Sequence, residues 1–243
     1  MTSANSNVDE AELRKFAEHA ANWWSRNGDF KALHDINPLR LGYIEARVKL
    51  ADAMVLDVGC GGGILTEAIA RQGAKVTGID LAAEPLEVAR SHGRQSDLDI
   101  DYLLCSTEQL AEDKSGCFDV VTCMELLEHV PEPSETIAAC ASMLKTGGSA
   151  FFSTINRNPK SWLFAIVGAE YVLNLLPRGT HRYEKFIRPS ELEAWCRKAG
   201  LTTAAIIGLH YNPLTSAYAL RSGVDVNYIM HFRRINDVVS GTP

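Results

Sequence analysis

The stretch "VLDVGCGGG", residues 55–63, decides how the rest of the chain is read. A short β-branched apolar run ends in an acid and four glycines, and the helical pattern "ILTEAIARQG" follows at once. Glycines in a strand-to-helix turn let the backbone approach a ligand and present its N–H groups. The stretch therefore predicts a ligand site at the carboxyl end of the first strand of a parallel sheet.

The pattern around this stretch predicts an α/β fold. Nearly continuous apolar runs alternate with helical patterns, which indicates a central, mostly parallel sheet with helices on both faces. Strands are expected at 54–58, 74–80, 100–105, 118–123, 149–155, 201–209 and 224–232, the last as an edge hairpin. Helices are expected at 9–27, 64–73, 83–93, 133–148 and 189–200, with a further one after a turn at Asn37-Pro38.

Composition limits the class of protein. The 243 residues are 46% hydrophobic and 22% charged, as in ordinary soluble proteins, and the net charge of −6 disfavours nucleic acid as a partner. Six scattered cysteines without a CxxC pair fit a reducing compartment better than a disulfide framework or a zinc module. With no signal-peptide pattern and no apolar run of about 18 residues, we expect a cytoplasmic protein.

The glycine turn distinguishes between two cofactors. A dinucleotide fingerprint needs a third glycine where this chain has Ile64, and Asp57 would repel a pyrophosphate, which disfavours a nicotinamide-dependent oxidoreductase. A cationic ligand tolerates Asp57, and S-adenosylmethionine (SAM) carries a sulfonium and an ammonium group. Asp80 ends the second predicted strand, at the spacing where an acid binds a ribose diol.

Together, "VLDVGCGGG" and "VTGID" resemble the SAM site of class I methyltransferases. The blocks "FKALHDINPLRLGYI", "TCMELLEHVPEP", "FFSTINRNPKSWLFAIVGAEYVLNLLPRGTH" and "GLHYNP" are similar to those of the ubiquinone-biosynthesis O-methyltransferases, from about residue 10 to residue 232. The resemblance implies a class I, Rossmann-like SAM methyltransferase. Its activity would be methylation of ring hydroxyls of 2-polyprenyl-6-hydroxyphenol and 3-demethylubiquinol.

The resemblance also implies a set of cofactor contacts. They are Gly59 and Gly61 for the amino-acid part of SAM, Asp80 for the ribose, and Arg40 and Met124 as further contacts, beside Asp57. Arg40 is suited to a carboxylate, and its alternative role is a surface salt bridge. At the adenine contact the chain departs from the frequent Asp-Ala pattern, so Thr107 and Glu108 take that place.

The stretch "CMELLEHVPEP", residues 123–133, supplies the candidate catalytic residues Glu125, Glu128 and His129. If one helical turn forms there, the three side chains share a face and could bind one divalent cation, Mg²⁺ or Zn²⁺. Alternatively, His129 acts as a general base without a metal, or the group is partly structural. The sequence leaves these three interpretations open.

An insert at 157–188 separates the fifth strand from the next helix. It holds the apolar run "SWLFAIVGAEYVLNLLP" and six basic against two acidic residues, a local charge of +4. This pattern is typical of a helix that docks on an anionic membrane surface through 161–188, and the alternative is a buried cap or a dimer contact. Docking would place the protein on the inner face of the cell membrane, near a polyprenyl phenol or quinol substrate and other biosynthetic proteins.

We therefore divide the chain into four segments and keep other functions open. The segments are an N-terminal helical cap (1–50), the SAM-binding core (51–156), the insert (157–188), and a C-terminal helix with strands that complete the sheet (189–243). The alternatives are a SAM-dependent methyltransferase for another small phenolic or lipid substrate, and a non-catalytic SAM-domain scaffold in a biosynthetic complex.

Overall fold

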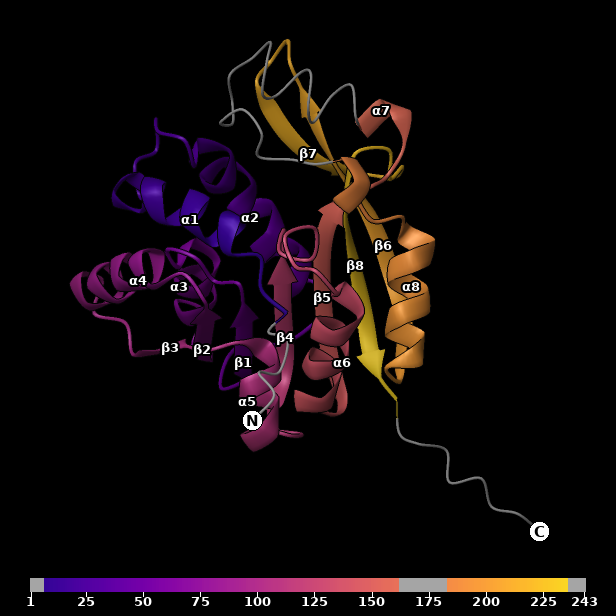
Figure 1. The fold of residues 1–243 in the computed structure, drawn as a ribbon, viewed down its shortest axis with the longest axis horizontal. Coiled ribbons are helices and arrows are strands. Elements are labelled where there is room, and N and C mark those ends of the chain that lie inside the picture. The colour runs from indigo at the N-terminus through magenta and orange to yellow at the C-terminus, as the bar shows by residue number, and fades with distance from the viewer. Residues whose placement is uncertain (1–6, 162–182, 236–243) are drawn as a thin grey trace.

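The computed structural model describes residues 7–161 and 183–235, and its strands form one eight-stranded sheet (Figure 1). The strands are β1 (Met54–Val58), β2 (Lys75–Asp80), β3 (Ile100–Leu104), β4 (Phe118–Met124), β5 (Leu144–Ile155), β6 (Leu201–Asn212), β7 (Ala217–Arg221) and β8 (Asn227–Arg234). Their order is β3-β2-β1-β4-β5-β8-β6-β7. The pairs from β3 to β5 are parallel, whereas β8 runs antiparallel to both neighbours.

Helices cover both faces of this sheet, as predicted. The described helices are α1 (Glu10–His19), α2 (Lys31–Glu45), α3 (Ile64–Ala70), α4 (Ala83–Gln95), α5 (Thr107–Asp113), α6 (Pro133–Met143), α7 (Pro159–Ser161) and α8 (Pro189–Lys198). Short 3₁₀ turns are η1 (Ala20–Asn22) and η3 (Tyr183–Lys185). None of the helices within the described ranges is long and apolar enough to span a bilayer.

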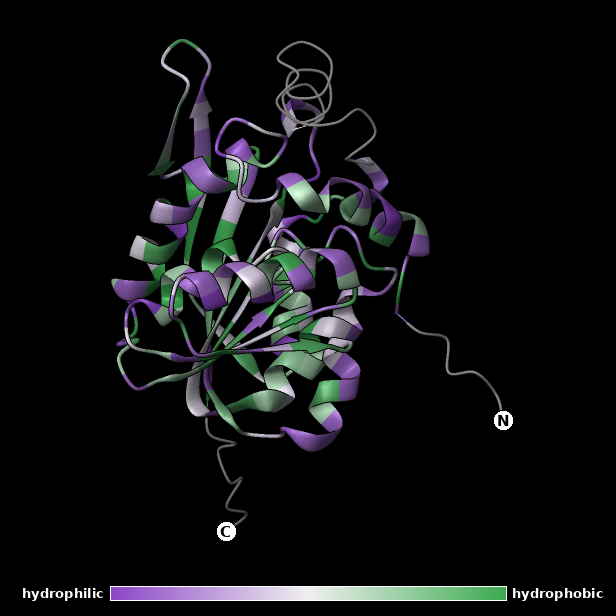
Figure 2. Ribbon diagram, turned by 90° about the vertical axis from the view of Figure 1, so that its left-hand side faces the viewer, coloured by the Kyte–Doolittle hydropathy of each residue, from purple (hydrophilic) through white to green (hydrophobic). Residues whose placement is uncertain are grey.

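Two apolar clusters hold the helices to the sheet. On one face, α2 and α3 bury Ile44 and Ile69 against Val55 and Phe151. On the other face, residues of α5, α6 and α8 pack against the adjacent strand positions, such as Phe152. Because neighbouring residues of a strand point to opposite faces, the apolar strands serve both layers. Figure 2 shows hydrophobic residues concentrated in the central strands and hydrophilic residues on the outer helix turns.

Near the N-terminus the helices differ from the prediction. The first helix ends at His19 instead of continuing to residue 27, and η1 takes over. The predicted turn at Asn37-Pro38 is wrong, because Pro38 lies inside α2. Proline removes one helical hydrogen bond, but burial of Ile36, Tyr43 and Ile44 on either side of it favours a continuous helix.

Three further differences lie elsewhere. Helix α5 and strand β7 were not expected, and β8 is not an edge strand, because it lies between β5 and β6. The edge is instead β7, which pairs with β6 in a hairpin. Of the predicted insert, residues 162–182 lie outside the described residues.

The topology places a site between β1 and β4. Strand order reverses there, since β1 leads to β2 and β3 on one side and β4 to β5 on the other. In open α/β sheets the crevice at the carboxyl ends of such strands binds ligands. Asp57 pairs with Thr122 in this register, so the residues that follow both strands meet at one edge.

Candidate active site

A cavity of about 1300 Å³ opens at the carboxyl ends of the central strands. The walls come from α1, α2, the glycine loop after β1, the end of β4, and the β6–β7 hairpin. All predicted site residues line it: Arg40, Asp57, Gly59, Gly61, Asp80, Thr107, Met124, Glu125, Glu128 and His129. The structure therefore brings together residues that are up to 89 positions apart in the chain.

The glycine loop is shaped by a side chain that the sequence analysis missed. Gly61 has a φ of +52°, and a Cβ there would lie 2.3 Å from Cζ2 of Trp23. A Cβ on Gly62 would also lie 2.3 Å from the indole. Both glycines are thus needed so that Trp23, which is itself buried, can pack on the loop. Its position just after α1 and the tandem "WW" were the only available signals.

Asp80 ties the glycine loop to the end of β2. One carboxylate oxygen accepts a hydrogen bond from Gly61 N and the other from Ala82 N, both at 2.8 Å. Burial raises the pKa of Asp80, whereas the hydrogen bonds from these two N–H donors lower it. A carboxylate has about four acceptor positions, so capacity remains for a ribose diol. Its role at the ribose stays a prediction.

Asp57 is hydrogen-bonded to two threonine hydroxyls and not to the backbone of the glycine loop. Its oxygens accept hydrogen bonds from Thr66 Oγ1 at 2.7 Å and Thr122 Oγ1 at 2.6 Å. Burial raises the pKa of this carboxyl, and the two hydroxyls and the Arg40 charge act against that rise. Because both oxygens already accept hydrogen bonds, Asp57 would attract a cationic ligand mainly through its charge.

Arg40 on α2 has unused hydrogen-bonding capacity. It is only 5% exposed, which excludes the surface salt bridge considered above. Nη2 lies 3.2 Å from Glu125 Oε1 but is too poorly aligned for a hydrogen bond, and Nε and Nη2 have no acceptor among the described residues. A buried guanidinium with open N–H groups suits a ligand carboxylate, such as that of the amino-acid part of SAM.

The candidate adenine contacts lie on two elements. Thr107 is the first residue of α5 and is buried, and Met124 ends β4 with 8% exposure. Glu108, in contrast, already accepts hydrogen bonds from Asn7 Nδ2 at 3.3 Å and Thr136 Oγ1 at 3.0 Å. Thr107 and Met124 are therefore better placed than Glu108 to face an adenine.

Glu125 stands at the turn out of β4. Its φ of +53° is unusual for a residue with a side chain, and such strain is often kept at functional sites. One oxygen accepts a hydrogen bond from Ser153 Oγ at 2.8 Å and the other from Asn227 Nδ2 at 3.4 Å. This residue thus lies between the Arg40 guanidinium and the β5–β8 pair.

Glu128 is a buried acid with an unused oxygen. It is 4% exposed, and Oε2 accepts a hydrogen bond from Thr154 Oγ1 at 2.8 Å. Burial, and then the charge of Glu125, raise its pKa to about 8. Oε1 has no hydrogen-bond partner within the described structure. A carboxyl of this kind is largely protonated at neutral pH and can donate to a substrate oxygen.

His129 is paired with a residue that sequence reasoning missed. Nδ1 lies 2.8 Å from Glu12 Oε2, and Phe16 approaches the ring edge-on at 5.3 Å between centroids. Burial alone would raise the pKa of Glu12, but hydrogen bonds from His129 and Lys15 lower it to about 2. Glu12 comes from α1, 117 positions earlier, and no spacing rule would connect the two.

The expectation that Glu125, Glu128 and His129 share one helical face is wrong. The turn forms over 126–129, closed by His129 N to Leu126 O at 2.8 Å, and Glu125 precedes it in a left-handed conformation. Its carboxylate consequently faces Arg40, while the imidazole faces Glu12. Residues 7–161 and 183–235 contain no group of three His, Cys, Asp or Glu side chains that could hold a metal ion.

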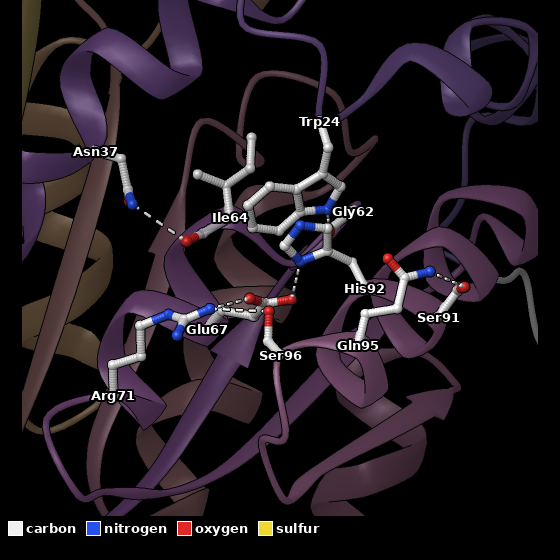
Figure 3. A network of polar contacts seen from close by, with 10 residues as sticks. All are labelled: Trp24, Asn37, Gly62, Ile64, Glu67, Arg71, Ser91, His92, Gln95 and Ser96. Carbon is white, nitrogen blue, oxygen red and sulfur yellow. Dashed lines mark hydrogen bonds and ion pairs between the residues drawn. The ribbon is translucent and has the colours of Figure 1, made fainter.

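A second network fixes the segment after α1 to the glycine loop (Figure 3). Trp24 Nε1 donates to Gly62 O at 2.8 Å, and its indole stacks on His92 at 3.4 Å with an angle of 4°. His92 Nδ1 in turn lies 2.6 Å from Glu67, which also pairs with Arg71. The N-terminal segment is therefore bound to α3, α4 and the loop at the same time.

Comparisons with known proteins identify the family of the chain. The family model described as "Methyltransferase domain" matches residues 16–206. A ubiquinone biosynthesis O-methyltransferase from Saccharophagus degradans is 57% identical over 97% of this chain and all of the relative. One of the same name from Pseudomonas fluorescens is 60% identical over 94% of this chain and 99% of the relative.

Solved structures agree on the fold. The structure of a magnesium protoporphyrin IX methyltransferase from Synechocystis, with bound SAH, has a TM-score of 0.69 at 18% identity, covering 93% of this chain and all of that one. A SAM-dependent methyltransferase from Aquifex aeolicus gives 0.63 at 13% identity, covering 94% and 100%. With the predicted class I SAM methyltransferase fold confirmed, and with sequence identity near 60% over almost the whole length, the chain belongs to the family of ubiquinone biosynthesis O-methyltransferases.

Proposed function

We propose that this protein transfers the methyl group of SAM to a ring hydroxyl of a polyprenyl phenol or quinol, namely 2-polyprenyl-6-hydroxyphenol and 3-demethylubiquinol. The observation that carries this proposal is a single cavity lined by two chemically different groups of residues. Arg40, Asp80 and the glycine loop suit the carboxylate, ribose and backbone contacts of SAM. Glu128 and His129, which line the same cavity, offer proton-transfer groups.

The remaining wall suits an acceptor with an apolar tail. The cavity is also lined by apolar and aromatic side chains of β5, the β6–β7 hairpin and the residue before β8: Ile155, Leu209, Tyr211, Tyr218 and Val226. The rings of Tyr211 and Tyr218 pack at a tilt of 42°, with 4.8 Å between their centroids. Apolar surfaces of this kind favour burial of an isoprenoid chain beside the ring.

The residues of the site supply orientation and proton transfer. SAM, when bound, supplies an electrophilic methyl group on a sulfonium. A phenol has a pKa near 10, so the hydroxyl needs a base at neutral pH. His129 accepts the phenolic proton as the oxygen attacks the methyl carbon. The protonated Glu128 donates a hydrogen bond to the neighbouring ring oxygen and so holds the ring in place.

A divalent cation remains the alternative way of making the phenol anionic. As placed, Glu125, Glu128 and His129 have separate partners, so we derive no step through a metal. A methyl-transfer assay on a short-tail catechol, with chelator and with added Mg²⁺ or Zn²⁺, tests both points. Methyl transfer that persists after thorough chelation supports the His129 base; loss that Mg²⁺ restores supports the cation.

The assay also separates the other candidate functions. No methyl transfer despite a thermal shift with SAH would point to another phenolic or lipid acceptor. The absence of any shift would revive a non-catalytic scaffold in a biosynthetic complex. His129→Ala and Glu128→Ala should each reduce kcat by more than tenfold while leaving the Kd for SAH within twofold.

We further propose that the insert 157–188 docks the protein on an anionic membrane surface through residues 161–188, from the cytoplasmic side. Its charge of +4 and its apolar run support this. Phe186 and Ile187 are buried in the core, so only residues 162–182 should be replaced by a Gly-Ser linker. Flotation with anionic and neutral vesicles is the test: equal binding of the intact and linker variants would contradict docking.

A further inference from the structure

Glu12 and His129 form a shielded pair in the wall of the cavity. Their side chains are 12% and 11% exposed, and Glu12 Oε2 lies 2.8 Å from His129 Nδ1. The other oxygen of Glu12 accepts a hydrogen bond from Lys15 Nζ at 2.7 Å. Both oxygens of the carboxylate therefore have defined partners, which fixes the direction of the bond to the imidazole.

This contact determines which ring nitrogen carries the proton. An ionised carboxylate only accepts hydrogen bonds, so His129 Nδ1 must be the donor. In the neutral ring Nε2 is then the acceptor. Phe16 packs edge-on against the imidazole, at an angle of 84°, and further limits its rotation. The imidazole is thereby held in one tautomer and one orientation.

Helix α1 carries Glu12 and is anchored at both ends. Before it, Asn7 donates to Thr136 Oγ1 at 3.0 Å and accepts from Glu132 N at 2.8 Å. After it, Trp24 donates to Gly62 O at 2.8 Å. Because α1 itself buries no residue, these end contacts, the Glu12 pair and the packing of Phe16 on Trp23 set its position over the cavity.

We propose that Glu12 is a positioning residue for methyl transfer: it holds the His129 ring so that Nε2 serves as the proton acceptor. This rests on the role of His129 in the proposed function. The phenolic proton moves to Nε2, the oxygen forms the new bond to the methyl carbon, and the pair of the broken C–S bond stays on sulfur. Glu12 never touches the reacting atoms; it sets where Nε2 lies before they meet.

Steady-state kinetics on the short-tail catechol is the first test. We expect Glu12→Ala to lower kcat by 10- to 100-fold with the KM for SAM within twofold. Glu12→Gln should retain more activity, because its amide oxygen can still accept from Nδ1. Glu10→Gln removes the same charge from the exposed face of α1 and is the matched control, with wild-type kcat expected.

The double variant Glu12→Ala/His129→Ala should be no slower than His129→Ala alone, since Glu12 acts through the imidazole. A wild-type kcat for Glu12→Ala beside a slow His129→Ala would overturn the proposal. A wild-type kcat for His129→Ala would instead reject the role of His129 in the proposed function.

A second test needs no turnover. ¹⁵N NMR of the histidine rings in the cofactor-free protein reports the tautomer, with the His129 signal identified by its loss in His129→Gln. We expect a protonated Nδ1 and an unprotonated Nε2 in wild type, and a shift toward the other tautomer in Glu12→Ala. Identical spectra for wild type and Glu12→Ala would show that Glu12 does not set the tautomer.

Discussion

At the scale of single residues, the glycines of the loop after β1 have a packing role that their motif does not indicate. Gly59 and Gly61 were expected to approach a ligand, and both do line the cavity. Yet the space that a Cβ would occupy is filled from within the protein, by Leu126 at 2.9 Å for Gly59 and by Trp23 for Gly61. The bare backbone therefore serves the packing of the protein as well as the cofactor.

Gly61→Ala tests this packing. We expect the Kd for SAH, measured by calorimetry, to rise at least tenfold, because the new methyl group collides with Trp23 and the φ of +52° is strained for alanine. Gly116 has a similar φ of +63°, and no atom lies within 4 Å of where its Cβ would be. The control variant Gly116→Ala should therefore bind SAH normally. In Gly61→Ala/Trp23→Ala the losses should be less than additive; simple additivity would argue against the collision.

Site residues that belong to short sequence motifs were predictable, and those whose contacts are long-range were not. Arg40, Asp80, Thr107 and Met124 all line the cavity. Short motifs fix the last three to the ends of β2, α5 and β4, whereas Arg40 lies inside α2. Trp23 and Glu12 were not predicted, since their contacts join α1 and η1 to loops far along the chain. Such pairings depend on how an N-terminal segment folds back over the sheet, which local patterns do not encode.

At the scale of elements, hydrophobic periodicity and turn residues located most of the strands of the sheet. The wrong or missing predictions for α5, β7 and β8 each have a particular cause. Helix α5 was not expected, although Ser106 and Gln109 form a capping box, a signal visible in the sequence. Strand β7 is only five residues long and follows a turn, so it resembled a continuation of the loop. Strand β8 was placed at an edge because its pairing with β5 joins residues 72 to 84 positions apart.

Removing the cap should measurably weaken α5. Ser106 Oγ accepts a hydrogen bond from Gln109 N at 3.1 Å, and Gln109 Oε1 accepts from Ser106 N at 2.9 Å. Ser106→Ala should lower the free energy of unfolding by about 1 kcal/mol in urea titrations. Ser134→Ala, in the first turn of α6, is the control. Equal stability of the two variants would mean that the cap contributes nothing.

At the scale of the whole molecule, a histidine in the middle of the sheet affects acid stability. His231 on β8 is 5% exposed and stacks on Phe151 at 4.5 Å. Burial, together with the nearby Arg47 and Arg233 charges, lowers its pKa to about 4. The unfolded chain binds this proton below about pH 6.5, whereas the folded protein does not until about pH 4. Stability is therefore lost as the pH falls through this window.

We expect this residue alone to remove about 2 kcal/mol of unfolding free energy between pH 7.5 and pH 5. Urea titrations at the two pH values measure it, with His231→Gln as the variant that lacks the titrating group. The variant should be less stable at pH 7.5 but lose less on acidification. His210→Gln, on the neighbouring strand β6, is the control; a wild-type pH dependence in His231→Gln would exclude His231 as the source.

The place of β8 also bears on how the chain folds during synthesis. This strand is made after every other described strand, yet it lies between β5 and β6 and pairs with both. While translation proceeds, β1 to β5 and their helices can assemble. The edge of β5 that pairs with β8 has no neighbouring strand until residues 227–234 leave the ribosome. A nascent chain stalled before residue 227 should therefore expose a sheet edge that chaperones recognise.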